Sequence, residues 1–120
     1  MASVNASFDP AMNVGSSMAV NWVIATAGDT GVRSPVEFAN YPDKTVHVTG
    51  TFGSVTLRGS NLANPSDATA GDWFNLTDPQ GNALTFTAAG GALIAQNPRW
   101  ISPITTGGSA YIINIVGVKS

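Results

Sequence analysis

The stretch DWFNLTDPQGNALTFTA, residues 72–88, predicts a β-hairpin and, through it, the fold class of the chain. Phe74 and Leu76 fall on one face of the first alternating segment, and Leu84 and Phe86 fall on one face of the second. Because side chains point alternately to opposite sides of a strand, this pattern is typical of a hairpin that buries one face and leaves the other in water.

The residues between the two segments are turn formers. Pro79 presets φ for the second position of a turn, and Gly81 and Asn82 tolerate positive φ. We therefore expect a turn at this point, and we find no catalytic chemistry in the hairpin.

The same period of two recurs along the rest of the chain. In the clearest example, from 45 to 52, valines and Phe52 lie on one side and threonines and His47 lie on the other. Gly50 and Gly53 interrupt this segment, which indicates a bulge and a turn. Further strands are expected at 18–25, 36–38, 54–58, 92–96, 100–105 and 111–118.

These segments predict an all-β chain. No ten-residue window has a helical period, and eight or nine short strands with Gly- and Pro-bearing turns are typical of a β-sandwich or barrel. Pro103 places its strand at an edge or breaks it there. The closing strand, 111–118, is apolar on both sides, which indicates a central strand or a face covered by a partner. Periodicity alone leaves a jelly roll and an immunoglobulin-like sandwich open.

The length of 120 residues corresponds to one domain. Residues 1–16 are small and polar, with isolated apolar side chains that include Phe8 and Met12. We interpret them as an extended N-terminal arm that precedes a sandwich domain at 17–120. An ordinary frayed terminus is the alternative.

The composition indicates a surface suited to association. Charged residues make up 10% of the chain, against about 25% in a typical soluble domain. A surface with few charges is weakly protected against association. The alternative is the ordinary preference of β proteins for Thr and Asn.

Charge and residue types exclude several classes of function. The net charge is −2 and the five cations are scattered, so the basic patch of a nucleic-acid-binding protein is absent. Without cysteine there is no disulfide and no thiolate nucleophile. The longest apolar stretch, 18–27, is too short to span a bilayer, and the N-terminal sequence has no signal-peptide pattern. We expect a soluble protein that contacts neither nucleic acid nor membrane.

No catalytic, cofactor or metal site is predicted. His47 is the only histidine, its neighbours on the same face are threonines, and no Gly-x-Ser-x-Gly motif occurs. We interpret it as a solvent-facing strand residue, with contact to a partner as the functional alternative. The acids fall mostly in turns, and the loop 61–67 has oxygen ligands without a recognised calcium spacing. We therefore expect that the chain is not an enzyme.

The three tryptophans differ in their expected surroundings. Trp22 shares the apolar side of its strand, which predicts a core position. Trp73 is out of phase with Phe74, which favours a core or interface position over a ligand site. An exposed Trp73 or Trp100 would instead supply a stacking platform for sugar rings.

Several motifs resemble small structural proteins of tailed phages, over about residues 28–118. The most specific are the Asp-Pro-Gln-Gly-Asn hairpin at 78–82 and Asn-Pro-Arg-Trp-Ile at 97–101. The other matching segments are Asp-Thr-Gly at 29–31, Pro-Val-Glu-Phe at 35–38, Tyr-Pro-Asp-Lys at 41–44, the strand 45–53, Gly-Ser-Asn at 59–61 and the hairpin flanks within 72–90. The family is that of tailed-bacteriophage capsid cement (decoration) proteins. The stretch 62–71 departs from it, because a shorter acidic loop is expected there.

This resemblance implies a jelly-roll β-sandwich on the outer surface of the virion, with no cofactor. The implied partners are the phage major capsid protein, whose subunits it would bridge, and further copies of the chain as a dimer or trimer. We expect Phe8, Met12, Trp73 and His47 as partner contacts. The alternatives are a carbohydrate-binding module and another virion part, such as a tail, baseplate or fibre-attachment component.

Overall fold

The computed structural model describes residues 3–4, 7–8, 17–26, 30–31, 34, 40–66 and 69–118. Within them the regular structure consists of strands and the 3-10 turn η2 (Ala70–Asp72), joined by loops. The strands are β1 (Ser3–Val4), β2 (Ser7–Phe8), β3 (Ser17–Ile24), β4 (Thr30–Gly31), β5 (Asp43–Thr51), β6 (Ser54–Ser60), β7 (Phe74–Asn75), β8 (Thr85–Phe86), β9 (Gly90–Ile94), β10 (Trp100–Thr106) and β11 (Ser109–Val118).

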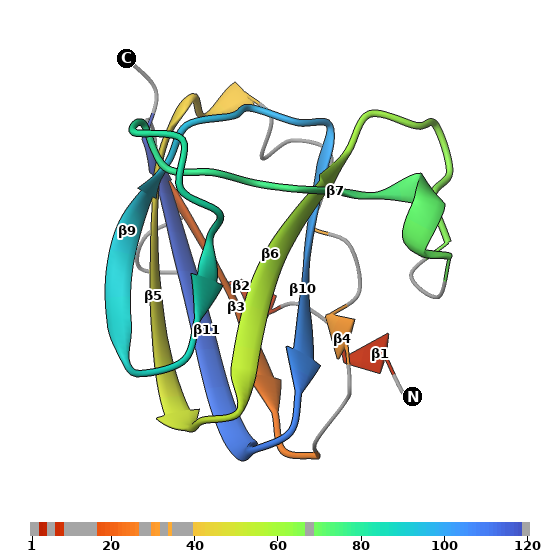
Figure 1. The fold of residues 1–120 in the computed structure, drawn as a ribbon. Helices are drawn as coiled ribbons and strands as arrows, with labels where there is room; N and C mark the ends of the chain where they lie inside the picture. The colour runs from red at the N-terminus through yellow and green to blue at the C-terminus, as the bar shows by residue number, and fades with distance from the viewer. Residues whose placement is uncertain are drawn as a thin grey trace.

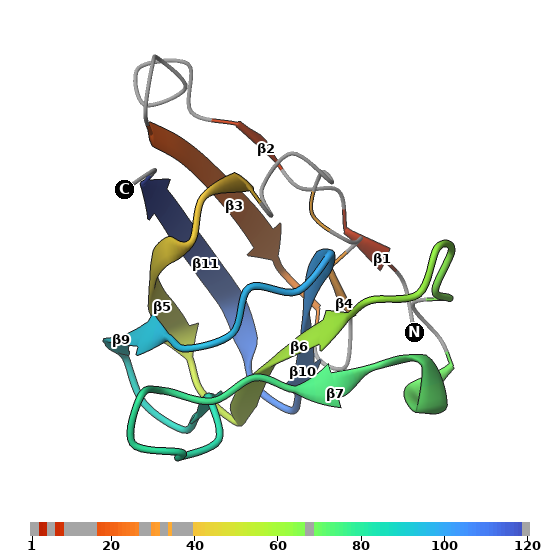
Figure 2. The ribbon, with the colours of Figure 1, turned by 90° about the horizontal axis from the view of Figure 1, so that it is seen from above.

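The strands form two sheets that face each other. Sheet A has the order β1-β4-β10-β6-β7, with β8 also paired to β6, and sheet B has the order β2-β3-β11-β5-β9. Figure 2 shows the two layers from above, with β3, β11, β5 and β9 in one and β4, β10, β6 and β7 in the other. All pairings are antiparallel except that of β1 with β4.

The strand order is that of a jelly roll. From β3 onward the chain passes between the sheets, so that β3, β5, β9 and β11 lie in sheet B and β4, β6 and β10 lie in sheet A. The short strands β7 and β8 lie along the same edge of β6 and together occupy one strand position. Four positions face four, as in a jelly roll. The predicted all-β sandwich is confirmed, with eleven strand segments in the described residues because five of them are only two residues long.

The core lies between the sheets and follows the predicted alternation. Val46 and Val48 are buried, while Thr45 and His47 on the same strand are exposed. Trp22 and Tyr111 are the largest fully buried side chains. Antiparallel sheets with one wet face produce this alternation because each strand buries every second residue.

Tyr111 joins the two sheets at one end of the sandwich. Its hydroxyl accepts a hydrogen bond from the Gly53 N–H and donates one to the Gly107 carbonyl, each at 2.8 Å. Its ring meets Phe52 edge-on, with centroids 5.3 Å apart. The turns β5–β6 and β10–β11 are thereby tied together (Figure 1).

The predicted bulge and strand positions are found with two differences. The irregularity faces Gly50, but the extra residue belongs to β11, where Ala110 has φ +55°. Pro103 does not break β10, which pairs along its length with β6 and on its other side with Thr30 of β4. The closing strand β11 lies in the centre of sheet B, which is one of the two positions that its sequence predicted. The strand predicted at 36–38 lies outside the described residues.

The hairpin has the predicted turn but a different course. The Asp78 carbonyl accepts from the Gly81 N–H at 3.0 Å, and Gly81 has φ +87°, whereas Asn82 has no positive φ. The two arms meet at the bridge between Thr77 and Ala83 and then diverge along the edge of β6. The turn therefore projects from the sheet edge.

The N-terminal segment contributes strands to both sheets. β1 extends sheet A beside β4, and β2 extends sheet B beside β3 (Figure 2). The described backbone of residues 3–4 and 7–8 is extended and paired with the domain. The division into an arm at 1–16 and a domain at 17–120 stays a prediction.

Candidate functional site

The outward side of sheet A is covered by its own chain around Arg58 and Ser102, although Thr85 on the same side is exposed. Arg58 and Ser102 are next to each other across β6 and β10 and point away from the core, yet both are buried. The Arg58 Nη2 donates to the Ser102 Oγ at 2.9 Å, and that hydroxyl donates to the Gly31 carbonyl. The guanidinium also lies 4.8 Å from the ring centroid of Trp73, in cation–π geometry. We call the part of this side around Arg58, Ser102 and Trp73 the covered face.

The loop between β6 and β7 is fixed by two indole N–H groups. Trp73 Nε1 donates to the Ser66 carbonyl and Trp100 Nε1 donates to the Leu62 carbonyl, each at 2.9 Å. Asn61 Oδ1 also accepts from the Arg99 N–H at 2.9 Å. The tryptophans therefore hold this loop in place.

The outward side of sheet B is largely open to solvent, although Ala19 on it is buried. Its residues form ladder rows across the strands: Val23, Ile112 and Thr49; Asn21, Asn114, His47 and Gly91; Ala19, Val116, Thr45 and Leu93; and Ser17, Val118 and Asp43. Val23, Leu93, Ile112 and Val118 are exposed apolar side chains. We call this surface, defined by these rows, the open face.

The open face has very little charge. Among its rows only Asp43 and His47 carry ionisable side chains, and Asp43 lies in the last row. The other members are apolar, hydroxyl or amide residues, or glycine. Such a surface can be covered by a partner without the large cost of desolvating charges.

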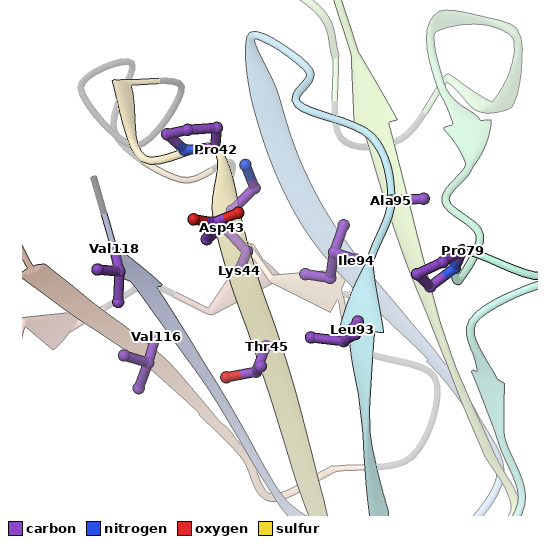
Figure 3. Close-up of a pocket in the computed structure, with 10 residues that line it drawn as sticks. All are labelled: Pro42, Asp43, Lys44, Thr45, Pro79, Leu93, Ile94, Ala95, Val116 and Val118. Carbon is purple, nitrogen blue, oxygen red and sulfur yellow. The ribbon is translucent and has the colours of Figure 1, made fainter. Parts of the chain in front are cut away.

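A groove of about 420 Å³ crosses one end of the open face. Figure 3 shows Val116 and Val118 of β11 on one side, Thr45 of β5 in the middle and Leu93 of β9 on the other side. Pro79, at the projecting hairpin turn, closes its far end. The groove therefore offers apolar walls at the point where the hairpin meets the sheet.

Lys44 lies beneath this groove and is buried. Its Nζ donates to the Tyr41 carbonyl at 2.9 Å and to Asn97 Oδ1 at 2.5 Å. Burial lowers the pKa of Lys44 from 10.5 to about 8, and the neighbouring Asp43 carboxylate raises it in part. The lysine holds the segment before β5 against the segment after β9.

The predicted partner contacts are distributed over the molecule and are not brought together. His47 is exposed in the middle of the open face. Trp73 lies on the covered face and is 9% exposed. Phe8 belongs to β2, whose side chains the structure does not describe, and Met12 lies outside the described residues. Their role as partner contacts stays a prediction.

The buried position predicted for Phe74 is wrong, whereas Trp73 is buried, as a core position requires. Phe74 was expected to share a buried face with Leu76, but its side chain is 42% exposed, while Trp73 is buried. The reason is local: β7 has only two residues, and Phe74 is paired with Gly59 at the sheet edge, where no partner side chain covers it. Trp73 packs on Arg58 instead.

A second hollow, of about 350 Å³, contains this exposed aromatic ring. Phe74 and Leu62 supply apolar surface, and Asn61 and Asp72 supply polar groups. Trp22 and Trp73 are buried and Trp100 is half-buried, so Phe74 is the most exposed ring in this region. Sequence reasoning missed it because the alternation placed Phe74 inside.

Two further observations concern metal ligands and membrane-spanning helices. Among the residues that the structure describes, no three acidic or histidine side chains are grouped as metal ligands. Over those same residues, no helix has the length and apolar character needed to cross a membrane.

Sequence comparisons found neither a matching family model nor a matching curated protein. Among solved structures, the chain is similar to the SPBc2 prophage-derived protein YomS, with a TM-score of 0.56 and 10% identity over 88% of this chain and 97% of that one. It also matches the Schizosaccharomyces pombe Cnp3 cupin domain with a TM-score of 0.47 and 12% identity, over 96% of this chain and 61% of that one. The likeness to YomS extends over nearly the whole of both chains and shows a shared fold.

Proposed function

We propose that the chain is a capsid cement protein, bound in many copies to the outside of a phage head, where it bridges major capsid subunits. In this role the protein is a structural part of the virion and performs no catalysis. The proposal rests above all on the open face, a solvent-exposed sheet surface with apolar rows and almost no charge.

The two outer faces differ in how far their side chains are already bound within the chain. The buried polar groups of the covered face are occupied within the chain, as the pair Arg58 and Ser102 illustrates. The open face instead exposes apolar side chains beside threonines and asparagines, which can form hydrogen bonds with a partner surface. Protein partners are the class that such a weakly charged, partly apolar surface suits best.

A cement role also fits the energetics of a repeated contact. A standard interface buries about 1,600 Å² in total. A copy that touches two capsid subunits gains effective concentration, because its second contact becomes intramolecular once the first has formed. Moderate affinity per contact is therefore sufficient when many copies are bound.

Two observations support the link to a phage. The hairpin and the Asn-Pro-Arg-Trp-Ile segment resemble capsid cement proteins. The fold is similar to that of a protein described as prophage-derived. We infer a phage origin from the two together.

The experiment is a cryo-EM map of phage particles that contain the chain. The proposal predicts density for many copies on the outer surface of the head, with the open face against the shell. Copies confined to the tail, the baseplate or a vertex would support another virion part and contradict the cement role.

The second hollow favours one alternative, a carbohydrate-binding site. Sugar rings stack on exposed aromatic rings and bind amides and carboxylates, and Phe74, Asn61 and Asp72 provide these groups. A glycan array tests it. Binding that is lost in Phe74→Ala and kept in Val23→Ala would support this function, and an array without binding would dismiss it.

A further inference from the structure

The outer edge of β9 differs from the other sheet edges in the described part of the chain. The other edges end in β1, β2, β7 and β8, each of two residues, and the projecting hairpin interrupts the edge formed by β7 and β8. β9 has five residues, pairs along its full length with β5 and ends sheet B. Figure 1 shows it at the side of the sandwich.

Along the five residues of β9 this edge lacks the protection that charges, proline or a bulge would give. The hairpin reaches the same edge just beyond the strand, where the Thr77 carbonyl accepts a hydrogen bond from the Ala95 N–H at 2.9 Å. At an edge strand, every second residue points its N–H and C=O away from the sheet, where another strand can bind them. Natural proteins block such edges with charged residues, proline or bulges. No charged residue occurs between Asp78 and Arg99, β9 contains no proline, and its register with β5 is regular.

We propose that β9 pairs in an antiparallel manner with β9 of a second copy of this chain, which makes sheet B continuous across a two-fold dimer. This inference goes beyond the cement role and does not depend on it. Two-fold contact brings each group close to its own counterpart, so a charged edge repels itself and an uncharged edge does not. The absence of charge therefore favours a second copy as the occupant.

The side chains of β9 fit this arrangement. Leu93 is 55% exposed on the open face, and Gly91 lies two residues away on the same face. When the pairing is centred on Ala92, Leu93 of one copy lies opposite Gly91 of the other, which places a large side chain beside a small one. Each Leu93 then loses exposed apolar surface on dimerisation.

Sedimentation equilibrium of the full chain tests the proposal. We expect a dimer for the natural sequence. Leu93→Lys and Leu93→Glu should each weaken dimerisation about tenfold or more, because the two like charges then lie on diagonal positions across the pair, within reach of each other. An equimolar mixture of the two variants should recover the dimer. Val23→Lys, which replaces a residue of similar exposure on β3, should leave it unchanged.

A chemical cross-link supplies a second measurement on minimally altered protein. The chain has no cysteine, so Leu93→Cys introduces a unique thiol. A short bis-maleimide should join two copies through Leu93→Cys and leave Val23→Cys uncoupled. A natural chain that stays monomeric up to millimolar concentration would overturn the proposal, as would a dimer that survives both charged variants. Monomers that still occupy phage heads would overturn this inference alone and leave the cement role standing.

Discussion

The two outer faces of the sandwich are built from the same fold but differ in what covers them. On the covered face, outward-pointing residues such as Arg58 and Ser102 are buried beneath the chain itself. On the open face, Val23, Leu93 and Ile112 remain exposed. An exposed sheet face with few charges and several apolar side chains is typical of a binding surface, whereas a covered face contributes to stability.

Each face also has a buried cation associated with it, and the two cations are held differently. Arg58 is hydrogen-bonded to Ser102 and stacked under Trp73. Lys44, beneath the groove of the open face, binds Tyr41 and Asn97 through a compact ammonium group. Because a lysine can lose its proton when buried and an arginine does not, only the lysine makes stability depend on pH in the alkaline range.

The largest expected change in unfolding free energy comes from substitutions that compare the two faces. Arg58→Ala removes a buried stem and its hydrogen bonds and leaves Trp73 without its packing partner, so unfolding free energy should fall by about 3 to 4 kcal/mol. His47→Ala, on the open face, should change it by less than about 0.5 kcal/mol. Urea unfolding of both variants measures the difference. Equal effects would remove the distinction between the faces.

The next effect concerns Lys44. Its pKa is about 8 in the folded protein and 10.5 ordinarily, so between these pH values the unfolded chain binds more protons. Stability is therefore lowest below pH 8 and rises as pH increases toward 10.5, by at most about 3 kcal/mol. The unfolding free energy of the natural chain should therefore rise relative to that of Lys44→Met by up to that amount over this pH window. A constant difference between them would show that burial does not lower the pKa of Lys44.

A smaller effect distinguishes two neighbouring aromatic residues. Trp73→Ala should cost about 2 kcal/mol, because the ring packs on Arg58 and anchors the loop through Ser66. Phe74→Ala should cost about 0.5 kcal/mol or less, since that ring is largely exposed. Thermal unfolding compares them. A larger loss of stability in Phe74→Ala than in Trp73→Ala would indicate that Phe74 is buried, as the alternation predicts.

The smallest effect lies at the hairpin turn. Backbone hydrogen bonds, that of Asn82 first, lower the pKa of Asp78. This contribution to stability is complete above the ordinary carboxyl pKa and is lost as pH falls through the lowered value. Asp78→Ala should therefore flatten the acid side of the stability profile slightly, with Asp72→Ala as a matched comparison. If the loss of stability at acidic pH is the same in Asp78→Ala as in the natural chain, the Asp78 carboxylate does not stabilise the turn.

The parts of the fold that were predictable from sequence are those set by local chemistry. The strand around Val46 and His47 shows its alternation because one of its faces is buried from Lys44 to Val48. The hairpin turn is readable because Pro79 and Gly81 impose their own dihedral preferences. Both signals act within a few residues.

What could not be predicted depends on contacts between distant segments. Two-residue strands such as β7 are too short to show an alternation, so Phe74 was placed inside although its side chain is exposed. The burial of Arg58 requires Trp73 and Ser102, which come from different strands. The open face likewise emerges only when β3, β11, β5 and β9 are placed in register.

The most direct test of the central claim is the occupancy of phage heads by variants of the two faces. Ile112→Lys places a charge in the middle strand of the open face, and Thr85→Lys places one on an exposed position of β8 in sheet A. Purified variants are added to heads stripped of the chain, and bound copies are counted. The account predicts that Ile112→Lys loses most of its occupancy while Thr85→Lys binds like the natural chain. Full occupancy by Ile112→Lys would contradict it.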